Sequence, residues 1–383
     1  MDLSIHSYIL DSRGGQDMKR LTKKSFLVCL IAVYVLGFSL FSWIKPADEF
    51  SVSERRYLKQ FPDLSIQTIL NGTFMSNFES YTLDQFPLRD TFRSVKSLVA
   101  GMVFQHKDVN DLYIYDDYIV SMEYPMHSDS ITWAAKKFEN VYNLYLKDSN
   151  SKVYFSIIPD KNYFLGEESG HLSFDYEAFE AEMTAQVPFM EYIPIMDQLT
   201  IEDYYMTDTH WNQTGILDVA QTLANGMGVS IEEEFEKLTV NAPFYGVYYG
   251  QFARPVKADV ISYYTNDILN QSIVYDHQNG KEIPMYDLKK VNDKDPYEMF
   301  LGGPLSLVTI ENPNANTEKE LVIFRDSFGS SIAPLLTEAY AKITLVDIRY
   351  IQPAMLEKFM TFDSQDVLFL YSTSVLNNSS TIK

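Results

Sequence analysis

The sequence predicts an α/β domain carried behind one membrane-spanning helix. Three observations support this fold class. An uncharged apolar run extends from Ser25 to Ile44, strand-like and helical segments alternate toward the C-terminus, and the earlier strand-like run SKVYFSII ends in the polar turn Pro159-Asp160-Lys161. A strand that finishes in a polar turn is the usual beginning of an open α/β sheet. The 383 residues suffice for such a domain with a smaller attachment.

The apolar run is long enough to cross a membrane, because a helix of about 20 residues spans roughly 30 Å of hydrocarbon. Four basic residues lie just before it, so we expect residues 1–24 in the cytoplasm and the rest outside the cell. A cleavable signal peptide is the alternative, but the following KPADEF lacks a small-x-small cleavage site. Because MKRLTKKSFL is itself a good beginning, we expect translation to start at Met18; recovery of residues 2–17 by peptide mapping would exclude this.

The composition excludes several classes of protein. The only cysteine, Cys29, lies inside the apolar run, so the rest of the chain has no disulfide. This fits the outer face of a bacterium without an oxidative folding system better than a eukaryotic secreted protein. Beyond residue 24 the chain has 26 basic and 49 acidic residues, a net charge near −23. Such a charge repels nucleic acid and anionic lipid headgroups, so we expect no nucleic-acid binding.

A stretch with helical periodicity follows the apolar run. Apolar residues recur at helical spacing around Phe74, Phe78 and Tyr81, and again further along. We expect residues 45–105 to form a helical juxtamembrane stalk that carries the main domain. A role in substrate binding is the alternative for this stretch.

The main domain is expected over residues 106–383. It begins with paired short strands in DVNDLYIYDDYIVSM and an amphipathic helix in ITWAAKKFENVYNLYLK. A helix is predicted over 213–227, followed by an acidic, tyrosine-rich and β-rich insertion over about 229–305, with Asn279-Gly280 as a hairpin turn. The strand ELVIFR, a helix after DSFGSS, the strand KITLVDIRY, the helix PAMLEKFM and the strand DVLFLY complete the α/β pattern.

The stretch YYMTDTHWNQTG places Asp208 and His210 two residues apart. Side chains at this spacing lie on the same side of an extended segment but on different sides of a helix. In an extended segment, with a helix beginning after the N-cap Asn212, the carboxylate can hold one imidazole nitrogen and leave the other free to take a proton. The alternative is a pair of solvated turn residues, which is the commoner outcome for Asp-x-His alone.

The serine in LVIFRDSFGSS is the candidate nucleophile. Ser327 lies where a strand passes into a helix, at the carboxyl edge of the predicted sheet, where helix N-terminal N–H groups can stabilise an oxyanion. Gly329 lets a substrate approach the backbone closely in this interpretation. Ser327 as nucleophile, His210 as general base and acid, and Asp208 as orienting carboxylate form a complete set for acyl transfer. A helix N-cap is the alternative for this serine.

Two residues end the predicted strand KITLVDIRY at the same edge of the sheet. Arg349 and Tyr350 could steady a developing oxyanion or a sugar hydroxyl there. The alternative for Arg349 is an ion pair with Asp347 or Asp326. The sequence leaves both interpretations open.

Three more residues complete the candidate site. Asp160 and Lys161 form either a supporting pair at the sheet edge or a surface turn, and Trp211 either stacks on a sugar or supports the His210 loop from a buried position. The other histidines share no spacing with carboxylates or cysteine that would build a metal site, and no glycine-rich phosphate loop or dinucleotide fingerprint occurs. We therefore expect no metal and no cofactor.

Several motifs together resemble one family. DTHWNQTG, RDSFGSS, VDIRYI, PDK, FLGG, SERRYLKQFPDL and DQFPLRD, spread over residues 52–371, are similar to motifs of the DHHW family. Its members are membrane-anchored extracytoplasmic proteins of Gram-positive bacteria, akin to the AlgJ and AlgX alginate O-acetylation proteins. The resemblance implies an SGNH-hydrolase-like three-layer α/β/α domain, permuted so that Asp-x-His precedes the serine, with Asp208, His210 and Ser327 as catalytic triad. Many members have a second histidine at the position of Thr209. The alginate proteins have a threonine there, like this sequence.

The residues and the resemblance together predict an extracytoplasmic O-acyltransferase, with acetyl as the expected group and a polysaccharide hydroxyl as the acceptor. Acetyl-coenzyme A is not available outside the cell, so the acyl donor must be handed across the membrane. The resemblance implies a multispanning membrane-bound O-acyltransferase as the partner that does this. Two alternatives stay open: an acetyl esterase that uses the same triad with water as acceptor, and a non-catalytic polysaccharide-binding or assembly factor.

Overall fold

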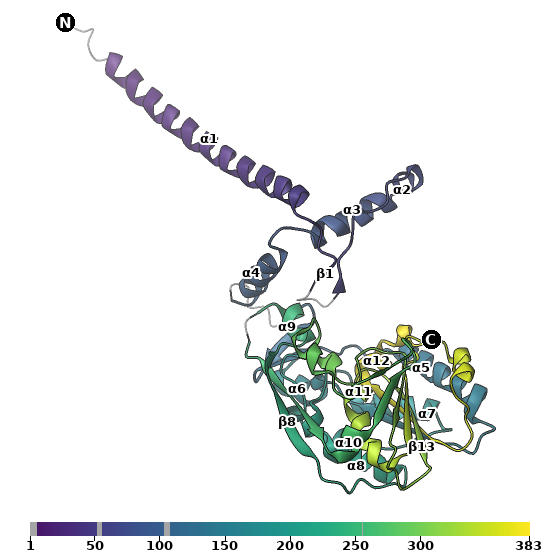
Figure 1. Cartoon of the computed structure of the whole chain (residues 1–383). Coiled ribbons are helices and arrows are strands. Elements are labelled where there is room, and N and C mark those ends of the chain that lie inside the picture. Colours follow the sequence, from purple (N-terminus) through teal and green to yellow (C-terminus); the bar gives the residue numbers. More distant parts are fainter. Residues whose placement is uncertain (1–5, 52–55, 103–107, 255) are drawn as a thin grey trace. The chain divides into compact units, whose positions relative to one another are not determined.

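The computed structural model describes the helices and strands of residues 6–51, 56–102, 108–254 and 256–383 (Figure 1). The chain divides into two compact units. The first contains Met1–Ser51 and Arg56–Val95, and the second contains residues 52–55 and Lys96–Lys383.

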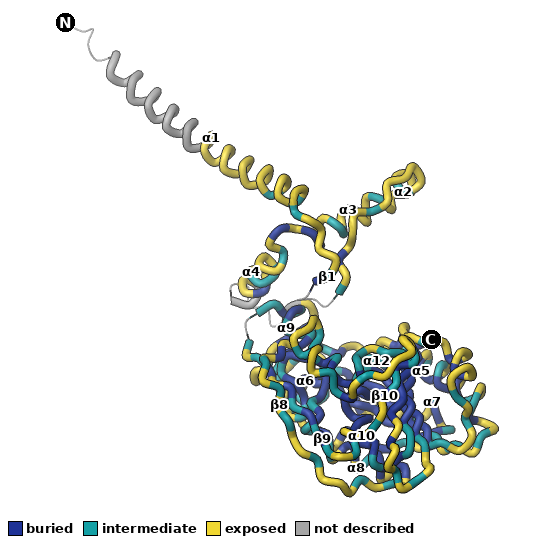
Figure 2. Tube along the Cα trace, in the orientation of Figure 1, coloured by how far each residue is buried: buried dark blue, intermediate teal, exposed yellow. Residues whose placement is uncertain are grey.

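The first unit begins with the long helix α1, His6–Ile44. Its part Lys24–Ile44 has a mean hydropathy of 2.4 and is the one helix of the described residues long and apolar enough to cross a membrane. Figure 2 shows this part of α1 exposed along most of its length. The predicted N-terminal apolar helix is therefore confirmed, while its orientation stays a prediction.

The rest of the first unit is a short ribbon and a helical hairpin. It contains β1 (Phe50–Ser51), β2 (Arg56–Tyr57), α2 (Ile66–Leu70), α3 (Thr73–Asp84) and the start of α4 (Arg89–Met102). The Asp84 carboxylate accepts hydrogen bonds of 2.8 and 2.5 Å from the Arg56 guanidinium and one of 2.9 Å from the Lys59 N–H. The Arg56 hydrogen bonds lower the pKa of Asp84 to about 2. This ion pair joins the ribbon to the end of α3.

The second unit is built on an eight-stranded sheet in the order β11-β10-β12-β14-β13-β15-β6-β7. Neighbouring strands are parallel from β14 to β7, and β12, β10 and β11 form an antiparallel edge. The predicted α/β fold class is confirmed. The strands are β6 (Lys152–Ile158), β7 (Glu191–Tyr192), β10 (Ile273–Asp276), β11 (Lys281–Ile283), β12 (Leu307–Glu311), β13 (Glu320–Arg325), β14 (Lys342–Val346) and β15 (Asp366–Ser372).

Both faces of this sheet are covered, which explains why its central strands are apolar without alternation. In β13, Leu321 and Ile323 belong to one hydrophobic core, and Val322 and Phe324 belong to the other. The three-layer arrangement follows. The first face packs against α8 (Leu217–Gly226) and the 3-10 helix Ala333–Ala339, and the second packs against α5 (Ser128–Val141), α7 (Tyr176–Gln186) and α12 (Thr373–Asn377).

The predicted insertion over residues 229–305 contributes to two sheets. Its first half forms the antiparallel ribbon of β8 (Glu236–Phe244) and β9 (Asp259–Thr265). Its later strands β10 and β11 join the edge of the main sheet, where Val274 pairs with Ile310 of β12. The hairpin turn at Gly280 was predicted, but a short alternating strand does not say which sheet it joins. A separate three-stranded sheet precedes α5: β3 (Asp108–Val109), β4 (Leu112–Tyr115) and β5 (Tyr118–Ser121).

Candidate active site

The imidazole of His210 lies between the side chains of Asp208 and Ser327. Its Nδ1 is 2.5 Å from Asp208 Oδ1, and its Nε2 is 2.7 Å from Ser327 Oγ. Asp208 is fully buried, His210 is nearly so, and Ser327 is partly exposed. In this order the ring can take the serine proton on one nitrogen while the carboxylate holds the other.

The Asp208–His210 segment is a tight loop rather than part of a helix. Tyr204 and Trp211 form an antiparallel bridge at its base, and the Tyr205 N–H donates to the His210 carbonyl at 3.1 Å. Asn212 holds the predicted N-cap position, but of the 3-10 helix Gln213–Gly215 that precedes α8, and its side chain makes no capping hydrogen bond. A non-helical backbone nevertheless places both side chains of the Asp-x-His motif together.

Ser327 lies in the turn between β13 and α11 (Gly329–Ile332), beyond the carboxyl end of its strand. The neighbouring carboxylate of Asp326 fixes this turn. It accepts a hydrogen bond of 3.0 Å from the Phe328 N–H, and bonds of 2.8 and 2.7 Å from the N–H and hydroxyl of Ser372 at the end of β15. Within the described part of the chain the Ser327 N–H donates to no protein atom. It is therefore available to an oxygen of a bound substrate.

The insertion holds the Asp208 carboxylate from its other side. Asp208 Oδ2 accepts a 2.8 Å hydrogen bond from the N–H of Val247, the first residue of α9 (Val247–Phe252). The Gly246 N–H donates to the Thr207 hydroxyl at 2.9 Å, and the Asp259 carboxylate accepts from the backbone N–H and the hydroxyl of Thr207. The sequence did not reveal these residues, because no local pattern links them to Asp-x-His.

An aromatic stack fixes the plane of the His210 ring. The Tyr297 ring lies parallel to it, with centroids 3.8 Å apart and 5° between the planes. The Tyr297 hydroxyl donates to Ser331 Oγ at 2.8 Å, and the Trp211 Nε1–H donates to the same oxygen at 2.8 Å. Trp211 is fully buried and packs edge-on against Phe328. The interpretation of Trp211 as a sugar platform is therefore wrong, and it supports the His210 loop from inside.

Asp160 and Lys161 are both buried, so the interpretation of a surface turn is wrong. Nor do their side chains bond to one another. Asp160 caps α6 (Lys161–Ser169), and its carboxylate accepts from the Asn162 N–H at 2.8 Å and from the hydroxyls of Tyr176 and Thr373 at 2.8 and 2.6 Å. Burial raises the pKa of Asp160 above its ordinary value.

The Lys161 ammonium supports the loop that carries Asp208. Its Nζ donates to the carbonyl oxygens of Tyr205 and Met206 at 3.0 and 3.1 Å. Burial lowers the pKa of Lys161 to about 7, although the Asp259 and Asp208 carboxylates act in the opposite direction. The Lys161 amine is thus buried and held mainly by backbone carbonyls of the site.

Arg349 forms an ion pair with Asp347, which is the alternative that the sequence offered to a role at an oxyanion or a sugar. The guanidinium donates to both carboxylate oxygens, from Nε at 2.9 Å and from Nη2 at 2.7 Å. Tyr350 is 52% exposed. A role of either residue toward an oxyanion or a sugar stays a prediction.

The Arg325 side chain packs so closely against residue 329 that only glycine fits there. A Cβ at Gly329 would lie 2.7 Å from Arg325 Cβ, and the glycine is buried. The Arg325 stem fills the side on which a Cβ would lie, and close approach of a substrate to the Gly329 backbone stays a prediction. The Arg325 head lies 3.9 Å from the Asp347 carboxylate and 3.3 Å from the Leu305 carbonyl oxygen.

The other described histidines lie outside this site. His127 Nδ1 is 3.1 Å from the Asn377 carbonyl oxygen, and the His171 ring stacks on Tyr113 at 3.8 Å. Among the residues that the structure describes, no three or more His, Cys, Asp or Glu side chains gather in a way that could hold a metal ion. The sequence expectation of no metal stays a prediction.

The mostly parallel sheet, covered on both faces, defines a three-layer α/β protein. Solved structures with this fold include a DHHW family protein from Eubacterium siraeum, 20% identical with a TM-score of 0.55 over 72% of this chain and 95% of that one. Another is Bacillus cereus PatB1 with a sulfonyl adduct, 19% identical with a TM-score of 0.55 over 70% and 97%.

A more distant neighbour is the O-acetyltransferase domain of Pseudomonas putida AlgJ, 13% identical with a TM-score of 0.43 over 70% of this chain and 92% of that one. Pseudomonas aeruginosa AlgX is also among the structural neighbours. No family model and no curated protein sequence matches this chain. The predicted resemblance to DHHW family proteins is confirmed in the fold by the Eubacterium siraeum structure.

Proposed function

We propose that this protein is a membrane-anchored O-acyltransferase that moves an acyl group, acetyl in the first instance, onto hydroxyls of an extracellular or cell-envelope polysaccharide. The observation that carries the proposal is the His210 ring, which lies 2.5 Å from Asp208 Oδ1 on one side and 2.7 Å from Ser327 Oγ on the other. A nucleophile, a base and an orienting carboxylate in this order are the arrangement for covalent acyl transfer.

In the first half-reaction Ser327 Oγ attacks the carbonyl carbon of the acyl donor while its proton passes to His210 Nε2. The oxyanion of the tetrahedral intermediate accepts a hydrogen bond from the Ser327 N–H, which has no other acceptor among the described residues. When the intermediate collapses, the bond to the donor's leaving group breaks and His210 returns the proton to that group. Ser327 is then an ester.

In the second half-reaction an acceptor hydroxyl loses its proton to His210 and attacks the ester carbon. Collapse of this intermediate releases the acylated acceptor, and the proton returns from His210 to Ser327 Oγ. Asp208 accepts the hydrogen bond from His210 Nδ1 and stabilises the imidazolium that forms in each half-reaction. With water as the acceptor the same steps give an acetyl esterase, so the acceptor decides between these two activities.

Two lines of support come from other proteins. The motifs resemble a family whose relatives O-acetylate alginate, which favours transfer to a sugar hydroxyl. PatB1, which shares the fold, carries a sulfonyl adduct in one solved structure. Sulfonyl reagents form such adducts with an activated nucleophile, and Ser327 is the residue of this chain that we expect to react in that way.

The anchor suggests where the reaction takes place. We propose that Lys24–Ile44 spans the cell membrane with residues 1–24 in the cytoplasm and the second unit outside, next to a membrane-bound O-acyltransferase that supplies the acyl group. Protease added to intact cells should digest the second unit. Complete protection of that unit would contradict this topology.

One experiment separates the three candidate functions. The full chain in nanodiscs is incubated with 4-nitrophenyl acetate, with and without an oligosaccharide, and acetylated sugar and free acetate are measured by mass spectrometry. The transferase proposal predicts acetylated sugar that is lost in Ser327→Ala. Free acetate alone, equally fast with and without sugar, would favour the esterase. No turnover above Ser327→Ala would favour the non-catalytic factor.

A further inference from the structure

The first unit exposes large apolar side chains well beyond its candidate membrane span. Six large apolar residues in or near α2 and α3 are each between 59% and 83% exposed: Phe61, Ile66, Leu70, Met75, Leu83 and Leu88. Figure 2 shows α2 and much of α3 as exposed. Large apolar side chains exposed in such number on one short segment indicate an interaction surface. This surface, on residues 56–95 and here named the arm, therefore requires a partner.

The arm also contacts the span itself. Phe38 of α1 stacks on Phe86 with centroids 5.7 Å apart and forms an edge-to-face pair with Phe92 with centroids 6.0 Å apart. Phe38 lies six residues before Ile44, the end of the span, which is about 9 Å along a helix at 1.5 Å per residue. If Lys24–Ile44 crosses the hydrocarbon, the arm residues that touch Phe38 lie at or below the depth of the lipid headgroups.

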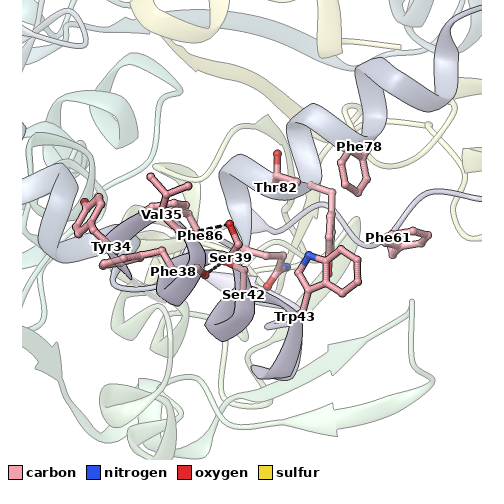
Figure 3. Close-up of a pocket in the computed structure, with 12 residues that line it drawn as sticks. Tyr34, Val35, Phe38, Ser39, Ser42, Trp43, Phe61, Phe78, Thr82 and Phe86 are labelled. Carbon is pink, nitrogen blue, oxygen red and sulfur yellow. Dashed lines mark hydrogen bonds between the residues drawn. The ribbon is translucent and has the colours of Figure 1, made fainter. Parts of the chain in front are cut away.

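A cavity of about 670 Å³ lies between the end of α1 and the arm. Figure 3 shows that rings from both sides line it. Tyr34, Phe38 and Trp43 come from α1, and Phe61, Phe78 and Phe86 come from the arm. An apolar, ring-lined space of this kind beside a membrane span suits hydrocarbon chains.

The charge of the arm agrees with a place at a membrane, in contrast to that of the second unit. Residues 56–95 hold four basic and four acidic side chains, whereas the second unit, residues 52–55 and 96–383, holds 21 basic and 43 acidic ones. Four charged groups of the arm form two ion pairs, Arg56 with Asp84 and Arg93 with Asp90. Burial of the neutral apolar face is thus not opposed by a net charge, and the attraction requires no particular lipid headgroup.

We propose that the arm lies in the lipid leaflet at the Ile44 end of the span, with acyl chains of that leaflet covering its apolar face and filling the cavity beside α1. The proposal rests on Lys24–Ile44 being a membrane span and is independent of the Ser327 chemistry. It gives the protein a second membrane contact beside the helix. The arm then follows the membrane surface.

The test uses the full chain with Cys29→Ala, one new cysteine carrying an NBD fluorophore, and one copy per phosphatidylcholine nanodisc with doxyl-labelled lipid. Labels at Leu83 and Leu88 should lose about half or more of their emission, as should a label at Leu36 of the span. A label at Leu172, 55% exposed in the acidic second unit, is the matched control and should lose little. Replacing a third of the lipid by phosphatidylglycerol should leave this pattern unchanged.

A second measurement needs no substitution. Met75 in the arm is 62% exposed and Met355 in the second unit is 39% exposed, so water alone would make Met75 the faster to oxidise. In nanodiscs we expect dilute peroxide to oxidise Met75 several-fold more slowly than Met355. Faster oxidation of Met75, or labels at Leu83 and Leu88 that behave like the label at Leu172, would overturn the proposal. So would shielding seen only when two copies share a disc, because the face would then belong to a second copy.

Discussion

A Cβ atom on Gly246 would lie 2.2 Å from the Cβ of Asp208 and 2.5 Å from its Oδ2. No side chain fits there unless the carboxylate moves. The insertion that carries Gly246 therefore sets the position of the group that orients His210. This close approach ties the β8–β9 region to the chemistry of a loop almost forty residues earlier in the sequence.

Gly246→Ala should displace Asp208 and reduce ester turnover by about a hundredfold, since a shift of roughly 1 Å in a catalytic group has costs of this order. Turnover of 4-nitrophenyl acetate by the full chain measures the effect. The control is Gly280→Asn in the β10–β11 turn, where φ is +65° and the nearest heavy atom to a Cβ is the Tyr275 hydroxyl at 3.8 Å. Because asparagine tolerates this conformation, the control should keep its activity. Equal turnover in both variants would contradict the role of Gly246.

Tyr297 should act on His210 through its ring more than through its hydroxyl. Tyr297→Phe keeps the parallel stack and loses the hydrogen bond to Ser331, so we expect a stability loss of about 1 kcal/mol and turnover within about threefold of the original. Tyr297→Leu removes the flat surface against the imidazole and should reduce turnover tenfold or more. Thermal unfolding and ester turnover of the two variants check this, and indistinguishable turnover would show that the stack has no role.

Lys161 should make the protein more stable as the pH rises from about 7 toward 10. Burial lowers its pKa in the folded protein to about 7 from the ordinary 10.5, so the unfolded chain holds a proton there that the folded chain has lost. The gain is up to about 1.4 kcal/mol per pH unit. Urea unfolding of the full chain at several pH values should show this slope, reduced in Lys161→Met and unchanged in the exposed control Lys136→Met. If the unfolding free energy of Lys161→Met rises with pH as steeply as that of the original chain, the pH dependence does not come from Lys161.

Glu123 should produce the opposite trend at lower pH. Glu123 is buried near Asp160. Burial, and to a smaller extent repulsion by the Asp160 carboxylate, raises the pKa of Glu123 from 4.5 to about 7. The folded protein then keeps a proton that the unfolded chain has lost, so this contribution to stability decreases as the pH rises from about 4.5 to 7. Glu123→Gln mimics the protonated form and should remove the decrease, whereas Glu139→Gln on the exposed side of α5 should not. Identical pH profiles for the two variants would be the contrary result.

The sequence predicted the elements that follow from local pattern. The apolar run, the strands ELVIFR and DVLFLY, and the two-residue spacing of Asp208 and His210 each depend on neighbours in the chain, and the structure contains them. The strand-to-helix turn likewise placed Ser327 at the carboxyl edge of the sheet.

The contacts that surround these residues could not be predicted in the same way. Gly246, Asp259 and Tyr297 come from the insertion and reach the site only through tertiary packing, so no spacing in the sequence points to them. Tryptophan is a residue type that can stack on a sugar, and glycine is one that allows a ligand close to the backbone, so the sequence suggested such roles for Trp211 and Gly329. Only the fold shows that protein atoms already occupy the space around them.

The account depends most on Ser327 being a nucleophile activated by His210. The direct measurement is the reaction of the full chain with phenylmethanesulfonyl fluoride, followed by peptide mass spectrometry and repeated with His210→Ala. We predict a single sulfonyl adduct on Ser327 that forms at least a hundredfold more slowly in the variant. An unmodified Ser327 in the native chain, or an adduct that forms equally fast without the imidazole, would contradict the proposed chemistry.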